Sequence, residues 1–255
     1  MDFQEEVRQQ IAGNGKNEVL LAGARSFMLE SIRARYSYNF EWLGRPIIQY
    51  PQDVVAMQGL IWSVRPDLVI ETGIAHGGSL ILSASMLAVL DYCDAVAQGD
   101  CLDPARPKRR VLGVDIDIRS HNRRAVETHP LSGRIDMLQG SSVSPEVAAK
   151  AREIASSYSR VLVCLDSNHT EDHVFAELDI YAPLVSPGSY CVVFDTVIER
   201  LPREVYPDRE WAPGNNPATA LQRWLKDHPE FSVDAAMDDK LLISVAPGGY
   251  LKRAD

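Results

Sequence analysis

The sequence lacks the patterns that mark secreted, zinc-binding and membrane-spanning proteins. Its four cysteines form no C-x-x-C pair, so a structural zinc site is not expected. Cys164 and Cys191 lie inside apolar runs, which predicts buried, unpaired thiols in a protein of the reducing cytoplasm. No run of about 18 apolar residues is free of charge, so a membrane-spanning helix is not expected. The N-terminal residues are polar and mixed in charge, unlike a secretory signal.

The chain also has fewer positively than negatively charged side chains. Lys and Arg number 26 against 35 Asp and Glu, which gives a formal net charge of −9. Such a chain predicts neither nucleic acid nor an anionic membrane as the main partner, because both carry negative charge. The length of 255 residues fits one large α/β domain with appendages.

The dinucleotide-binding spacing G-x-G-x-x-G is absent, although a glycine-rich turn is present. An apolar run from Leu68 ends at Glu71, and Gly73 and Gly77 follow before an apolar, helix-like segment. A buried strand, a glycine turn and a helix N-terminus together predict a pocket for a nucleotide-like cofactor. Glu71 would repel a pyrophosphate but suits an α-ammonium or a ribose hydroxyl. The turn therefore favours S-adenosylmethionine over NAD, with an ordinary strand–helix turn as the alternative.

Strands and helices alternate after this turn. This βαβ pattern predicts a mostly parallel, doubly wound sheet that is covered on both faces. A predicted hairpin at 231–247 brings the expected sheet to seven strands, with a final antiparallel pair. The remaining predicted strands are 111–115, 134–139, 160–166 and 189–195, and the predicted helices include 145–158, 172–185 and 218–228.

The N-terminal part of the chain does not follow this alternation. Residues 1–35 have helical periodicity, and residues 36–53 form an aromatic segment that Pro46 and Pro51 interrupt. That segment is predicted to be an irregular arm, followed by a helix at 53–64. The expected organisation is an N-terminal helical segment and arm at 1–53, and a cofactor-binding domain at 54–255.

Acidic residues end four of the predicted strands. Ligands of open α/β sheets bind beyond the carboxyl ends of the strands, so these side chains are expected to meet at one edge. Asp115 is suited to binding the ribose hydroxyls. Each acid by itself is also explained as a helix N-cap, but four at one edge are harder to explain that way. The four residues are Glu71, Asp115, Asp166 and Asp195.

Asp166 and Asp195 end strands that should be neighbours. Two carboxylates held this close repel each other, and a hard cation such as Mg²⁺ relieves the repulsion. Carboxylates bridged by water, without a metal, are the alternative. His169 follows Asp166 closely, so its imidazole is a candidate to take the proton from a substrate hydroxyl. His173 is the competing candidate, and His76 in the glycine turn is expected to face the cofactor.

These motifs resemble the class I S-adenosylmethionine-dependent methyltransferases, and more closely the cephalosporin hydroxylase family within them. The resemblance covers roughly residues 36 to 252. It implies a Rossmann-like fold, bound S-adenosylmethionine and Mg²⁺, and O-methylation of a sugar in natural-product or glycan biosynthesis. The motifs that carry it are FEWLGRPIIQYPQD, RPDLVIETGIAHGGSL, GVDID, LDSNH, VVFDT, GNNP and LLISVAPGGYLKR.

Catechol O-methyltransferase is a more distant resemblance and implies individual roles. Its E-x-G-x-x-x-G-x-S pattern matches Glu71, Gly73, Gly77 and Ser79, which implies that Ser79 binds the methionine carboxylate. Its ribose-binding acid matches Asp115, and its adenine-side serine matches Ser142. Its metal-binding aspartates match Asp166 and Asp195, and Asp166 is also expected to be catalytic and to contact the cofactor. Its catalytic lysine falls on His169, and its metal-binding asparagine falls on Thr196.

The expected activity is metal-assisted O-methylation of a small polar acceptor, such as a free or nucleotide-linked rhamnose. A cephalosporin hydroxylase or methoxylation role and a phenolic acceptor are alternatives on the same fold, and a nicotinamide oxidoreductase is a further one. A homo-oligomer is expected. Two segments are candidates either for the acceptor pocket or for a subunit contact. They are the aromatic arm (Tyr36, Tyr38, Phe40 and Trp42) and the loop at 209–216.

Overall fold

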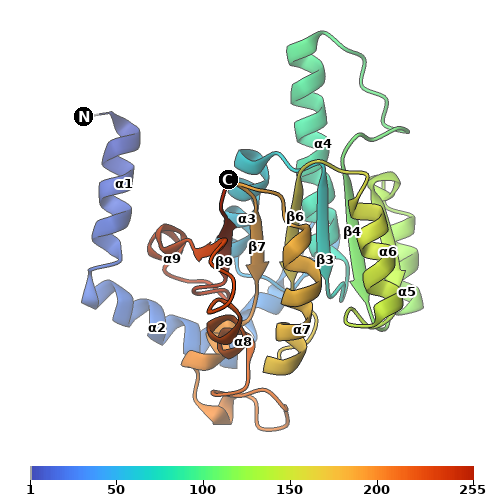
Figure 1. Ribbon diagram of the computed structural model, residues 1–255. Coiled ribbons are helices and arrows are strands. Elements are labelled where there is room, and N and C mark those ends of the chain that lie inside the picture. Colours follow the sequence, from blue (N-terminus) through green and yellow to red (C-terminus); the bar gives the residue numbers. More distant parts are fainter. Residues whose placement is uncertain (1) are drawn as a thin grey trace.

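The computed structural model describes residues 2–255, and a seven-stranded mixed sheet runs through its centre (Figure 1). The strand order is β5-β4-β3-β6-β7-β9-β8. The first five strands in this order are parallel, and β9 is antiparallel to both β7 and β8. The predicted doubly wound sheet with a final antiparallel pair is confirmed. The strands are β3 (Leu68–Thr72), β4 (Arg110–Asp115), β5 (Ile135–Gln139), β6 (Val161–Leu165), β7 (Tyr190–Val193), β8 (Phe231–Val233) and β9 (Tyr250–Arg253).

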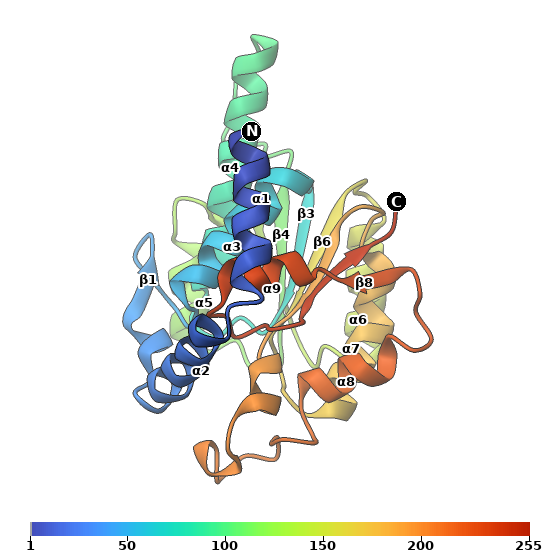
Figure 2. The same ribbon diagram turned by 90° about the vertical axis from the view of Figure 1, so that its left-hand side faces the viewer.

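Helices cover both faces of the sheet (Figure 2). Successive residues of a strand point to opposite faces, so each buried strand supplies two cores. Val69 packs in the core with Leu60, whereas the next residue, Ile70, packs with Leu178 in the other core. One face carries α3 (Pro51–Val64), α4 (Gly78–Gln98) and α5 (Ser120–Glu127), and the other carries α6 (Pro145–Ala155), α7 (Glu171–Tyr181) and α8 (Pro217–Trp224).

The N-terminal part forms two helices, α1 (Phe3–Asn14) and α2 (Glu18–Arg33), followed by the aromatic arm. The arm is more regular than predicted. It contains a short 3-10 helix at Tyr36–Asn39 and an antiparallel pair of strands, β1 (Phe40–Trp42) and β2 (Arg45–Ile47). Pro46 is tolerated because this two-stranded sheet consists only of edge strands. The predicted boundary between residues 53 and 54 falls inside α3.

The C-terminal pairing differs from the prediction in its details. Strands β8 and β9 pair as expected, but α9 (Ala235–Leu241) lies between them, and β9 begins only at Tyr250. The residues of α9 are mostly strong helix formers, which explains why this segment is not a strand. A Cβ atom on Gly249 would lie 2.1 Å from the Val193 carbonyl oxygen, so glycine is needed where the chain meets β7. Short 3-10 helices at Ser132–Arg134, Ala182–Leu184, Thr196–Arg200 and Arg203–Val205 complete the described elements.

Helix α4 is the one described helix whose length and composition would allow it to cross a membrane, with a mean hydropathy of 1.7. The sequence did not predict a helix of this kind, because Asp91 and Asp94 interrupt the apolar run. Leu80, Ile81 and Leu87 of this helix are buried in the core beside the sheet. Packing against the sheet therefore accounts for the apolar character of its first half.

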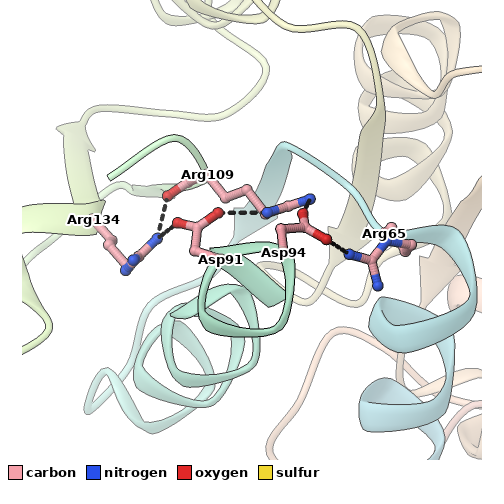
Figure 3. A network of polar contacts seen from close by, with 5 residues as sticks. All are labelled: Arg65, Asp91, Asp94, Arg109 and Arg134. Atoms are coloured by element: carbon pink, nitrogen blue, oxygen red, sulfur yellow. Dashed lines mark hydrogen bonds and ion pairs between the residues drawn. The ribbon is translucent and has the colours of Figure 1, made fainter. Parts of the chain in front are cut away.

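A buried charge network ties α4 to the strands beside it (Figure 3). Asp91 accepts hydrogen bonds from Arg109 and Arg134, and Asp94 accepts from Arg109 and Arg65. Arg134 is only 5% exposed, so its charge depends on Asp91 for compensation. The network lies at the amino ends of the strands, where Arg109 immediately precedes β4.

Replacing Asp91 by asparagine is expected to lower the free energy of unfolding by about 3 kcal/mol, because it leaves buried arginine charge uncompensated. Urea denaturation followed by circular dichroism measures this change. Asp94→Asn is the matched control, since the Asp94 side chain is 30% exposed and its loss should cost much less. Equal effects of the two substitutions would contradict the interpretation.

Candidate active site

The glycine turn between β3 and α4 has the close backbone approach that its sequence predicts. Gly73 has a φ of +88°, and a Cβ atom there would lie 2.0 Å from the Asp166 carbonyl oxygen. Gly77 has a φ of +84°, and its Cβ atom would lie 2.5 Å from the Val126 side chain. Both positions therefore require glycine, and the turn brings β3 and β6 together at their carboxyl ends.

Three side chains hold this turn in place. The Asp115 carboxylate accepts hydrogen bonds from the backbone N–H groups of Ile74 (2.7 Å) and Ala75 (3.3 Å). Arg45 of the arm donates to the His76 carbonyl oxygen, and Asn122 of α5 donates to the Ala75 carbonyl oxygen. Neither Arg45 nor Asn122 was predicted to hold the turn, because both are distant from it in sequence.

Two grooves run along the carboxyl edge of the sheet and meet at Gly73, Asp115 and Ser167. We call them the arm-side groove, between the arm and the glycine turn, and the helix-side groove, next to α7. Six residues predicted to bind the cofactor line one groove or the other, and Gly77 shapes the turn between them. The arm-side groove includes Gln49, Gly73, His76, Ser79, Asp115 and Asp166, and the helix-side groove includes Gly73, Asp115, Ser141, Ser142 and His173.

Glu71 lies behind the glycine turn rather than in the groove. It is 4% exposed, it accepts a hydrogen bond from the Ser79 hydroxyl, and burial raises its pKa to about 8. With Gln49, Asp53 and Asp166, it lines a small inner cavity that adjoins the arm-side groove. The Ser79 hydroxyl proton is thus engaged with Glu71, and a methionine carboxylate would meet the N–H groups of the α4 N-terminus.

This burial predicts a pH-dependent stability of the cofactor-free protein. Glu71 has a folded pKa of about 8 against 4.5 as its ordinary value, so the folded state retains a proton that the unfolded chain releases. The free energy of unfolding should therefore fall as pH rises through this window. Glu71→Gln removes the effect and still offers Ser79 an acceptor. We expect the variant to be roughly 2–4 kcal/mol more stable than wild type at pH 8, with little difference near pH 4.5. Denaturant melts across this range measure it, and a pH-independent difference would contradict it.

Asp166, His169 and Asp195 form a compact cluster at the ends of β6 and β7. One ligand atom from each lies within 4.8 Å of the others, and His169 Nε2 is 3.1 Å from Asp195 Oδ2. Burial and the Asp195 charge raise the pKa of Asp166 well above its ordinary range. Asp195 has a φ of 57°, a strained conformation that occurs at functional sites. The cluster has the donor atoms and negative charge that suit a hard divalent cation.

Thr196 follows Asp195, but its side chain has another partner. It is 1% exposed, and its hydroxyl donates to the Pro247 carbonyl oxygen at 2.9 Å. The Thr196 hydroxyl proton is thus engaged with Pro247, and Thr196 as a metal ligand stays a prediction.

The loop at 209–216 packs against the cluster. The Trp211 ring meets the His169 ring edge-on, with centroids 4.8 Å apart, and the Arg209 guanidinium lies over Trp211. Glu199 accepts hydrogen bonds from Gly214 N–H and the Asn216 side chain, which fixes the loop. Trp211 is thus placed where an acceptor next to His169 would meet it.

The aromatic arm has mainly a packing role. Tyr36 makes ring contacts with Phe27, Phe40 and Tyr50, and the Trp42 indole N–H donates to Ser85 on α4. These contacts fasten the arm to α2 and α4. The arm residues that line the groove are Pro46 and Ile47 at the end of β2, and Ile48 and Gln49, which follow it.

His173 lies in the helix-side groove, away from the charged cluster. Its Nε2 atom is 3.1 Å from the Ser142 hydroxyl and 3.2 Å from the Ser167 hydroxyl. Buried Glu177 accepts a hydrogen bond from Ser167 and lies 3.6 Å from the same nitrogen. Of the two histidines considered from the sequence, His169 is therefore the one beside Asp195.

The sequence of this chain is similar to the sequences of known proteins. A family model described as Rhamnosyl O-methyltransferase/CmcI matches residues 34–254. A curated rhamnosyl O-methyltransferase of Mycobacterium leprae (strain TN) is 27% identical over 216 residues, which are 83% of this chain and 82% of the relative.

Solved structures share the fold at low sequence identity. A structure of CmcI described as Mg-SAM has a TM-score of 0.56 at 15% identity, and covers 86% of this chain and 78% of that chain. The apo structure of CalS11, a TDP-rhamnose 3′-O-methyltransferase of calicheamicin biosynthesis, has a TM-score of 0.52 at 16% identity and covers 99% of each chain. Because the family model spans most of the sequence, the chain belongs to the Rhamnosyl O-methyltransferase/CmcI family, and the expected O-methyltransferase class is confirmed with it.

Proposed function

We propose that the chain transfers a methyl group from S-adenosylmethionine to a sugar hydroxyl, with a divalent cation assisting the reaction. One observation carries the proposal. Asp166 lines the arm-side groove and is also a member of the charged cluster, so cofactor and acceptor sites adjoin at one side chain. Curated rhamnosyl O-methyltransferases and the TDP-rhamnose enzyme support rhamnose, free or nucleotide-linked, as the acceptor class.

The residues present fit the cofactor. Gly73 lines both grooves, and the turn that contains it can only keep its shape with glycine at 73 and 77, because a Cβ atom there would meet Asp166 or Val126. Among the described residues that line the two grooves, none is Lys or Arg, whereas Asp115 and Asp166 are acidic. A cationic sulfonium and ammonium suit this lining, and the pyrophosphate of a nicotinamide cofactor does not. Ser142 and His173 suit adenine, and Asp115 suits the ribose.

The residues present also fit a divalent cation. Asp166 and Asp195 supply two carboxylates, and Mg²⁺ prefers oxygen ligands of this kind. When bound, the cation supplies Lewis acidity that makes an acceptor hydroxyl more acidic. S-adenosylmethionine supplies the methyl group.

Within this site, His169 receives the proton of the acceptor hydroxyl. His169 Nε2 lies 3.1 Å from Asp195 Oδ2, so the imidazole is held beside the charged cluster, where an imidazole nitrogen can accept a proton. Trp211 restrains the imidazole from its edge, and the glycine turn sets the position of the methyl donor. Proximity and alignment supply most of the rate enhancement, because both reactants are held in one crevice.

Two measurements test the proposal. Isothermal titration calorimetry should detect binding of S-adenosylhomocysteine but not of NADH. Labelled S-adenosylmethionine is then incubated with TDP-rhamnose, free rhamnose, a catechol or a cephalosporin. One of the two sugars should acquire the label faster than the other acceptors. Absence of S-adenosylhomocysteine binding would refute the methyltransferase. Labelling of the cephalosporin or the catechol instead would assign the alternative acceptor on the same fold.

We further propose a cytoplasmic homo-oligomer that acts on small molecules and needs neither nucleic acid nor a membrane. The buried cysteines Cys164 and Cys191 are both unpaired, which fits a reducing compartment. Sedimentation velocity measures the assembly, and a monomer at micromolar concentration would contradict it.

A further inference from the structure

The arm at 36–53 contributes to the arm-side groove one polar side chain, Gln49, for which the sequence predicted no role. Gln49 follows β2, is 7% exposed, and lines both the groove and the inner cavity behind it. Its Nε2 atom donates to Asp166 Oδ2 at 3.3 Å, while its Oε1 atom is buried without a hydrogen-bond partner. A buried acceptor without a donor is costly, so this oxygen calls for a ligand that donates.

The position of the other contacts fixes which part of the cofactor lies beside Gln49. Asp115 stands at the junction of the two grooves and suits the ribose, and the helix-side groove suits adenine. The methionine end must then extend along the arm-side groove, toward Gln49 and Ser79. That end carries a carboxylate, which suits the N–H groups of the α4 N-terminus, and an ammonium, which needs acceptors.

Few acceptors remain for the ammonium. Glu71 is covered by Ser79 and lines the inner cavity rather than the groove. Asp166 and Gln49 line the groove itself. The Gln49 amide already holds Asp166 through its nitrogen, so its oxygen is directed to a second partner.

We propose that Gln49 binds the α-ammonium of S-adenosylmethionine through Oε1 while holding Asp166 through Nε2. This inference rests on the proposed function, and adds to it a cofactor-binding residue that the N-terminal arm delivers. Gln49 then connects the methyl donor with the charged cluster, because its Nε2 atom holds Asp166, which is a member of that cluster. Gln49 selects for cofactors that carry the amino-acid end.

The test compares two probes on three proteins. S-adenosylhomocysteine carries the amino-acid end, and 5′-methylthioadenosine has the same adenosine thioether without it. Wild type, Gln49→Leu and Gln52→Leu are titrated with each probe by calorimetry. Gln52 is the matched control, because its Oε1 atom is also buried without a partner, yet it lines neither groove nor the inner cavity.

Gln49→Leu should weaken S-adenosylhomocysteine binding by roughly tenfold or more, as expected for the loss of a hydrogen bond to a charged group. Binding of 5′-methylthioadenosine should stay within about twofold of wild type, since adenosine contacts are unchanged. Gln52→Leu should leave both affinities unchanged. Equal loss for both probes, or no loss for either, would overturn the proposal. If wild type binds neither probe, the proposed function itself fails, which is a distinguishable result.

Discussion

Replacing His169 with alanine is expected to lower turnover by about 10² to 10⁴-fold, the usual contribution of a general base. The loss should appear in kcat, because His169 lines neither groove in which the cofactor is expected to bind. Affinity for S-adenosylhomocysteine should remain near that of wild type. Steady-state kinetics with a methylated sugar as the readout, together with calorimetry, measures both quantities.

His173→Ala is the matched control for this substitution. It removes a histidine from the helix-side groove, so it should weaken cofactor binding and leave the chemical step largely intact. If His173→Ala lowers kcat and His169→Ala does not, the assignment of the base is wrong.

The His169 experiment also separates two roles that the cluster permits. An imidazole within 4.8 Å of two carboxylate oxygens is placed either to take a proton or to act as a third metal ligand. Mn²⁺ titration of His169→Ala, followed by electron paramagnetic resonance, distinguishes them. Unchanged Mn²⁺ affinity with lost turnover supports the base, whereas weakened affinity of 10-fold or more, the usual cost of disturbing a metal's ligand environment, would identify a ligand.

Removal of divalent metal is expected to reduce turnover by roughly 10³-fold or more, since Lewis acidity contributes several kcal/mol to such reactions. Dialysis against a chelator followed by titration with Mg²⁺ measures the loss and its recovery. S-adenosylhomocysteine binding should survive, because the glycine turn and Asp115 do not depend on the cation. A chelated enzyme with full activity would show that the carboxylates act without metal.

Asp195→Asn tests the metal requirement by changing a proposed ligand instead of the metal concentration. Asparagine tolerates the left-handed backbone that Asp195 adopts, so the fold should persist while one anionic ligand is lost. The variant should need a higher Mg²⁺ concentration for half-maximal activity. An unchanged Mg²⁺ requirement would remove Asp195 from the proposed metal site.

The order of strand-end residues predicted that four acidic side chains lie at one edge of the sheet, and they do. Glu71, Asp115, Asp166 and Asp195 each follow a β-branched apolar run, and parallel strands place such ends at one edge. The sequence predicted less well which neighbouring group each side chain hydrogen-bonds to. Glu71 lies behind the turn with Ser79, because a carboxylate inside the sheet hydrogen-bonds to the nearest hydroxyl. Strand periodicity cannot reveal such a choice.

The sequence by itself determined the sheet, its covered faces and the glycine turn, because these follow from local periodicity and residue spacing. The resemblance of its motifs indicated the family. Only the tertiary structure decided how Gln49, Arg45 and Trp211 lie in the site. Gln49 and Arg45 come from the arm and Trp211 from a loop after β7, and both segments are distant in sequence from the glycine turn. Their positions depend on the packing of the arm against α2 and α4 and on the hydrogen bonds that Glu199 accepts from the loop. Such long-range contacts leave no periodic signal, so no local pattern encodes them.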